Sequence, residues 1–98
     1  MVDVHIAGTN YVENIKDLEP GLKDGTKVHF FREQENEHDP LAIVIKDDQG
    51  NKLGYIPRRK NEILARLMDA GKLIYGTVFK KQQTGNWIKI ELQVYLDD

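Results

Sequence analysis

Hydrophobic and polar residues alternate along much of this chain, which is typical of strands that bury one face. Near the start, Val2, Val4 and Ile6 alternate with Asp3 and His5. Near the end, aliphatic residues occupy every second position from 88 to 96. Segments with this alternation or with a short apolar run are predicted as strands, namely 2–7, 26–32, 41–46, 52–56, 73–81 and 87–96.

Turn-forming residues separate the later strands. The sequence DDQGN at 47–51 predicts a hairpin that joins 41–46 to 52–56, because Asp, Gly and Asn tolerate turn conformations. QQTGN at 82–86 joins the last two strands in the same way.

One segment has helical periodicity instead. A helix is predicted over 61–70, with Asn61 as its N-cap and Gly71 as its end. Its expected apolar face is formed by Ile63, Leu64, Leu67 and Met68. The stretch from 10 to 25 is interrupted by Pro20 and Gly21, so we expect at most a short helical turn there.

These elements predict a mainly β protein with one principal helix, of the α+β class. Several short strands separated by turns favour a small six-stranded barrel or rolled sheet, since closure removes exposed edges. The helix is expected to cover one end of this barrel, because its apolar face must be buried. A length of 98 residues suits a single domain over 1–98.

Composition narrows the function classes. Cysteine is absent, which excludes disulfides, cysteine-based metal sites and thiol nucleophiles. The start of the chain resembles no signal peptide, and no apolar run approaches the roughly 20 residues of a membrane span. We therefore expect a cytoplasmic protein without membrane contact. The net charge of −2 argues against a general polyanion binder, although 50–66 is rich in Lys and Arg while 33–39 is acidic.

No catalytic motif is present, so the chain is not expected to be an enzyme or to carry a cofactor. The three histidines, His5, His29 and His38, lack the spacing of a zinc protease, and no phosphate-binding glycine loop occurs. The acidic stretch Glu33, Glu35, Glu37 and Asp39 could hold a hard cation, but it lacks the regular spacing of a calcium loop. We expect no metal site, and a metal-dependent enzyme remains a distant alternative.

Polar and aromatic residues instead recur where the predicted strands end. Taken singly, each could form a turn or cap the core. Their joint arrangement favours a binding site made of Asn10, Tyr11, Asn36, His38, Asp39, Tyr55, Arg58 and Trp87.

The sequence resembles the HIRAN domain family. The similarity rests on Gly8 with Tyr11, on REQENEHDPLAIVI at 32–45 and on LGYIPRRKNEILARLMDAG at 53–71. The family implies a small barrel of the OB-like or SH3-like kind that binds single-stranded DNA at a free 3′ end, in DNA repair. In this chain Asn10 replaces a basic residue and His38 replaces a frequent tyrosine, which predicts weaker binding or a different ligand.

The resemblance implies a role for each candidate residue. Asn36, His38 and Asp39 would line a pocket for the terminal nucleotide, with Tyr11 and Tyr55 beside it. Trp87 would stack on a base. Phosphates would be held by Arg58, with Arg59, Lys60 and Lys80 as further possible contacts.

A carboxylate in such a pocket favours ends, since it accepts a bond from a 3′ hydroxyl and repels the phosphates that flank interior sugars. An alternative function is a protein-interaction module that docks on a nuclease, a helicase or a phage-related partner.

Overall fold

A computed structural model describes residues 2–9, 12, 15–85 and 87–97. Its elements along the chain are β1 (Val2–His5), α1 (Ile15–Leu18), a 3-10 turn (Glu19–Gly21), β2 (Lys27–Arg32), β3 (Ile43–Lys46), β4 (Lys52–Tyr55), α2 (Arg58–Asp69), β5 (Leu73–Thr84) and β6 (Trp87–Asp97). The six strands form one antiparallel sheet in the order β1-β6-β5-β2-β3-β4. The predicted mainly β class with one principal helix is confirmed.

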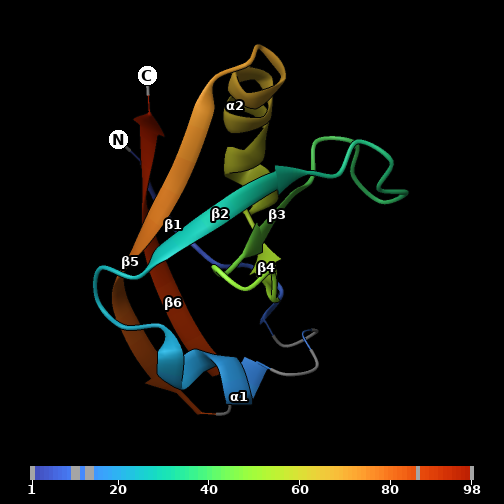
Figure 1. Cartoon of the computed structure of the whole chain (residues 1–98). Helices are drawn as coiled ribbons and strands as arrows, with labels where there is room; N and C mark the ends of the chain where they lie inside the picture. The colour runs from blue at the N-terminus through green and yellow to red at the C-terminus, as the bar shows by residue number, and fades with distance from the viewer. Residues whose placement is uncertain (1, 10–11, 13–14, 86, 98) are drawn as a thin grey trace.

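The sheet curls into a half-barrel (Figure 1), and the chain just after one edge strand, β1, meets the other edge strand, β4, at one point. Ala7, just after β1, and Tyr55, at the end of β4, exchange two backbone hydrogen bonds of 2.8 Å. Gly54 permits this approach, because a Cβ atom there would lie 2.5 Å from the carbonyl oxygen of Ala7. The chain after β1 is thereby held against the end of β4.

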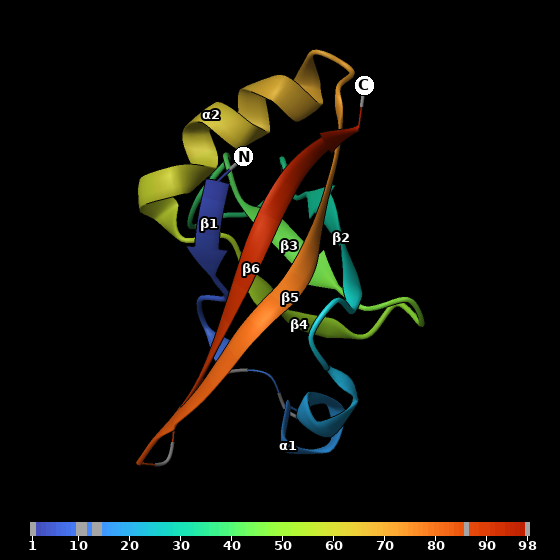
Figure 2. The ribbon, with the colours of Figure 1, turned by 90° about the vertical axis from the view of Figure 1, so that its left-hand side faces the viewer.

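The two helices lie at opposite ends of the half-barrel, and β5 and β6 form one long hairpin between them (Figure 2). Aliphatic residues from all six strands and from α2 form one core, which includes Ile6, Val28, Ile43, Leu53 and Ile90. Because side chains on a strand alternate between faces, the residues between these core positions lie on the outside of the sheet.

The helix α2 differs from its prediction. It begins at Arg58, three residues before the predicted start, because Arg and Lys favour helices and Pro57 already supplies a suitable φ of −59° at the N-cap. Asn61 is therefore not the N-cap: it lies inside the helix and is only 3% exposed, on the same face as Leu64 and Ala65. Ile63 was wrongly placed on the apolar face, as it is 73% exposed.

The strand boundaries shift by a few residues. β5 runs on to Thr84, beyond the predicted end at 81, with a bulge between Val78 and Lys80. β3 begins at Ile43, because Asp39, Leu41 and Ala42 take part in the turn before it. The short helical turn expected between 10 and 25 corresponds to α1 and the 3-10 turn.

Candidate functional site

A hollow of about 440 Å³ opens where the sheet closes on itself. The turn after β1, the loop between β2 and β3, the end of β4 and the start of α2 all contribute to it. Its lining residues are Ala7, Gly8, Asn36, His38, Asp39, Ala42, Tyr55, Ile56 and Arg58. The structure thus brings together five of the predicted site residues, which come from two separate segments of the sequence: Asn36, His38, Asp39, Tyr55 and Arg58.

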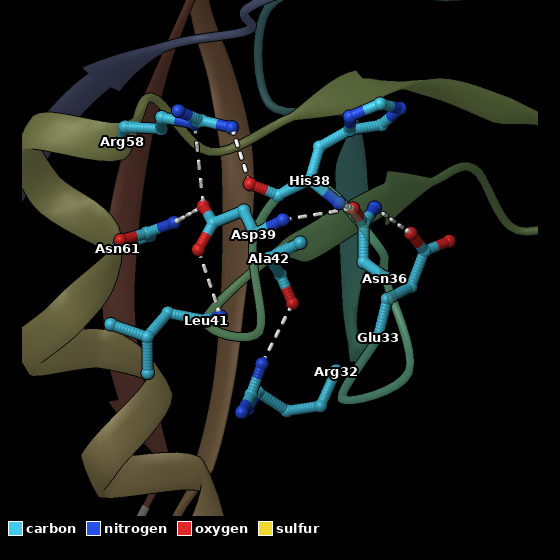
Figure 3. A network of polar contacts seen from close by, with 9 residues as sticks. All are labelled: Arg32, Glu33, Asn36, His38, Asp39, Leu41, Ala42, Arg58 and Asn61. Atoms are coloured by element: carbon cyan, nitrogen blue, oxygen red, sulfur yellow. Dashed lines mark hydrogen bonds and ion pairs between the residues drawn. The ribbon is translucent and has the colours of Figure 1, made fainter.

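The loop at 33–42 is held in shape by Asn36. Its side-chain oxygen accepts hydrogen bonds from the backbone N–H groups of His38 at 2.9 Å and Asp39 at 3.1 Å. Its amide nitrogen donates to Glu33 at 3.0 Å (Figure 3). Asparagine is favoured in such turns because its short side chain can take the place of backbone partners. Asn36 therefore fixes the backbone that carries the pocket.

Arg32 holds the same loop in place through hydrogen bonds and an ion pair. Its guanidinium donates to the carbonyl oxygens of Ala42 at 2.8 Å and Pro40 at 3.0 Å. It also forms an ion pair with Asp69 at the end of α2, with Nε 2.9 Å from Oδ1. The bond from Arg32 lowers the pKa of the Asp69 carboxyl below its usual value. The guanidinium of Arg32 thus binds the loop and the helix, and Arg32 does not line the pocket.

Asp39 is the acid inside the pocket, and its side chain is 18% exposed. One carboxylate oxygen accepts the backbone N–H of Leu41 at 2.9 Å, and the other accepts the amide of Asn61 at 2.7 Å. The Leu41 N–H, aided by Asn61 and by the charges of Arg58 and Arg32, holds the pKa of Asp39 below its usual value despite its burial. Asp39 is therefore ionised at neutral pH, with lone pairs left over for a further donor.

Arg58 lies beside this acid at the mouth of the pocket. Its Nη2 donates to the carbonyl oxygen of His38 at 2.7 Å, and its Nε lies 3.7 Å from Oδ2 of Asp39. Its side chain is 71% exposed, and a guanidinium has five N–H donors, so several remain available to an anion. A hydrogen-bond acceptor and a cation with spare donors thus stand next to each other (Figure 3).

Tyr55, at the end of β4, also lines the pocket. Its hydroxyl donates to Glu33 at 2.7 Å, and Lys52 Nζ lies 3.0 Å from the same hydroxyl. Burial raises the pKa of Glu33, but the bonds from Tyr55 and Asn36 and the charges of Lys52 and Lys46 outweigh it, so that this pKa is lowered. This contact between Glu33 and Tyr55 is not predictable from the sequence alone, because the two residues are 22 positions apart.

A family model for the HIRAN domain matches residues 1–97 of this chain. The chain belongs to the HIRAN domain family. It is similar to a protein of known structure from Lactobacillus plantarum, with 34% identity and a TM-score of 0.90 over 98% of this chain and 91% of that one. The crystal structure of the HIRAN domain of human HLTF has 22% identity and a TM-score of 0.78, over 97% and 73% of the two chains. No curated protein matches the chain.

Not all of the predicted site residues line the pocket described above. Trp87 pairs with Thr84 at the hairpin end of β6 and does not line the pocket, and Lys80 is exposed on β5 opposite Glu91. Asn10 and Tyr11 lie outside the described residues.

Arg59 and Lys60 line a second, smaller hollow of about 180 Å³ with His5 and Lys89. The pKa of His5 is lowered there by burial and by the charges of Lys89, Arg59 and Lys60, against an opposing effect of Glu91.

The acidic side chains of the loop at 33–42 do not form one cluster. Glu33 and Asp39 are bound to different partners, while Glu35 and Glu37 are exposed. Within the described residues, no group of three His, Cys, Asp or Glu side chains could hold a metal ion. The described part of the chain also contains no helix that is long and apolar enough to cross a membrane.

Proposed function

We propose that this HIRAN domain binds single-stranded DNA and receives a free 3′ end in the pocket of Asp39 and Arg58. Membership of the family supports a nucleic-acid-binding role. The observation that carries the finer proposal is the adjacent placement of an ionised carboxylate and an exposed guanidinium in one hollow.

The two groups suit different parts of a terminal nucleotide. The 3′ hydroxyl donates to the free lone pairs of Asp39 in a charge-assisted bond, which is stronger than a bond between neutral groups. Arg58 takes the phosphate on the 5′ side of the same nucleotide through its unused N–H groups. Tyr55 and the imidazole of His38 offer flat surfaces to the base.

The same carboxylate explains why an end is chosen over the interior of a strand. An interior sugar carries a phosphate on its 3′ oxygen, and Asp39 would repel that negative charge at close range. The bonds from Leu41 and Asn61 keep Asp39 ionised, so repulsion persists at neutral pH. The pocket therefore accepts a hydroxyl and rejects a phosphate.

The test compares three forms of one short DNA strand that is labelled away from its 3′ end. Fluorescence anisotropy should show tight binding of the 3′-hydroxyl form, and much weaker binding of the 3′-phosphate form and of a closed circle. A matching strand with a 5′-phosphate controls for added charge and should bind like the hydroxyl form. Equal affinity for all forms would refute recognition of the end.

A further inference from the structure

Three aromatic rings on the sheet each lie beneath a lysine ammonium. Lys52 Nζ is 4.5 Å from the ring centre of Tyr55, Lys46 Nζ is 5.2 Å from that of Phe31, and Lys27 Nζ is 4.6 Å from that of Tyr75. These distances are within the roughly 6 Å of a cation–π contact. The pairs involve four adjacent strands, β4, β3, β2 and β5.

The strand register places these pairs on one face. Phe31 lies opposite Val44, which lies opposite Tyr55, so their side chains share a row across β2, β3 and β4. His29 lies opposite both Lys46 and Tyr75 in the next row. Because Val28 and Phe30 point into the core, their neighbours on β2 point outward.

A second aromatic contact extends this face onto β6. The rings of Tyr75 and Tyr95 are stacked, with centroids 5.3 Å apart and planes at 22°. Phe31 is 49% exposed although it is a large apolar side chain, and it lies between Tyr55 and this pair. We call the face formed by Lys52, Tyr55, Lys46, Phe31, Lys27 and Tyr75 the outer track.

The charges on the outer track suit a polyanion. Lys27, Lys46 and Lys52 form no ion pair among the residues that the structure describes. Two acids lie nearby: Glu33 accepts the Tyr55 hydroxyl at 2.7 Å, and Oδ1 of Asp48 lies 2.6 Å from Nε2 of His29. Lys27 and Lys52 are exposed and Lys46 is partly exposed, and Lys52 also donates to the Tyr55 hydroxyl at 3.0 Å. An ammonium held by such weak contacts can be displaced by a base and can then bind the adjoining phosphate.

The outer track begins in the pocket, because Tyr55 belongs to both. Two strand spacings, about 10 Å, separate Tyr55 from Phe31, and a diagonal of about 7–8 Å separates Phe31 from Tyr75. A DNA strand whose 3′ end is bound at Asp39 would therefore pass the rings of Tyr55, Phe31 and Tyr75 in turn as it leaves the pocket.

We propose that the outer track carries single-stranded nucleic acid away from the pocket, with bases stacked on Tyr55, Phe31 and Tyr75 and phosphates on Lys52, Lys46 and Lys27. This inference rests on the proposed function, since the end in the pocket fixes where the strand starts. Stacking on exposed rings tolerates any base, so the track adds affinity without sequence preference.

A competing route leads over the start of α2 to the hollow of Arg59 and Lys60. That hollow also contains Asp3 and Glu91, and its Lys60 is bound to the carbonyl oxygen of Asp3 at 2.8 Å. Among the described residues that line it, His5 has the one ring on which a base could stack, whereas the outer track has three aromatic rings. The outer track is therefore the better route for a strand.

The experiment uses two DNA strands with free 3′ hydroxyls, about 3 and about 10 nucleotides long, because sites on related barrels span about 4–16 nucleotides. Phe31→Ala should weaken binding of the long strand about five-fold or more and leave the short strand unchanged. Lys46→Gln should reduce the slope of log K against log salt by about 0.7 for the long strand. Matched controls on α2 and α1, Ile63→Ala and Lys16→Gln, should change neither.

Each other outcome has a definite meaning. No loss in either variant overturns the track, and a loss in Arg59→Gln would then assign the strand to the second hollow. An equal loss for both lengths overturns it too, because Phe31 would be acting through the pocket. If Phe31→Ala weakens the long strand while the native domain binds its 3′-hydroxyl and 3′-phosphate forms equally, the track stands and end recognition fails. Absence of binding at every length refutes both proposals.

Discussion

Replacing Asp39 with asparagine tests whether its charge selects the end of a strand. The substitution keeps the size of the side chain and removes the negative charge. The new amide oxygen can still accept the N–H of Leu41, and Asn61 can turn its carbonyl oxygen toward the new amide nitrogen. The pocket should keep its shape, which is checked by circular dichroism and thermal melting.

The expected effect depends on the group at the 3′ end. A hydrogen bond to a charged group contributes about 1.5–3 kcal/mol, so Asp39→Asn should weaken binding of a 3′-hydroxyl strand about 10- to 150-fold. A 3′-phosphate strand should bind the variant as well as or better than the native domain, because the repulsion is removed. The preference for hydroxyl over phosphate should therefore collapse.

A control is available in the same loop. Glu37→Gln makes the same change in net charge at an exposed position outside the pocket, so it reports the general effect of charge on binding of a polyanion. Titrations by fluorescence anisotropy of both variants with both strands complete the comparison. If Asp39→Asn changes the two affinities by the same factor as Glu37→Gln does, Asp39 does not read the end of the strand.

Two further predictions concern the fold that holds the pocket. Gly54→Ala should destabilise the domain by about 1–3 kcal/mol in urea unfolding, because its Cβ would meet the carbonyl oxygen of Ala7, whereas Gly21→Ala, with open space around it, should cost little. Stability should also fall in acid: lowered folded-state pKa values at Asp39 and Glu33 stabilise the domain above the unfolded pKa values near 4, and this stabilisation is lost as the pH falls below them. Urea titrations at pH 7, 5 and 3 check this, and unchanged stability at pH 3 would contradict it.

The alternation of side chains was sufficient to predict the strands and the barrel class, because burial of one face acts on each strand locally. It was insufficient for α2. An asparagine before an apolar run reads as an N-cap, but Asn61 is on the buried face because Asp39, 22 residues earlier, accepts its amide. A polar residue three and four positions before Leu64 and Ala65 was the available sign that Asn61 has a buried partner.

The candidate site was predictable to a similar extent. Its residues were found by their position at strand ends and by family resemblance, yet their contacts depend on which strands are neighbours. The pairing of Lys46 with Phe31 and of Lys27 with Tyr75 requires the order β5-β2-β3. Alternation cannot supply that order, because it shows which face a residue occupies and not which strand lies beside it.

On the proposed function, a protein of net charge −2 binds a polyanion through cations that are clustered locally. Arg58 and the three lysines of the proposed outer track would make about four phosphate contacts, which predicts a salt slope of roughly −3 for a single strand. So few contacts would lose about 50-fold in affinity between 50 and 200 mM salt, and they would give only modest affinity for any stretch of the nucleic-acid strand. The proposed bond between Asp39 and a 3′ hydroxyl would then decide where the domain binds, since interior sites offer the same phosphates without this bond. The domain would therefore select 3′ ends because its affinity for an end exceeds its affinity for the interior of a strand, and not because its overall affinity is high.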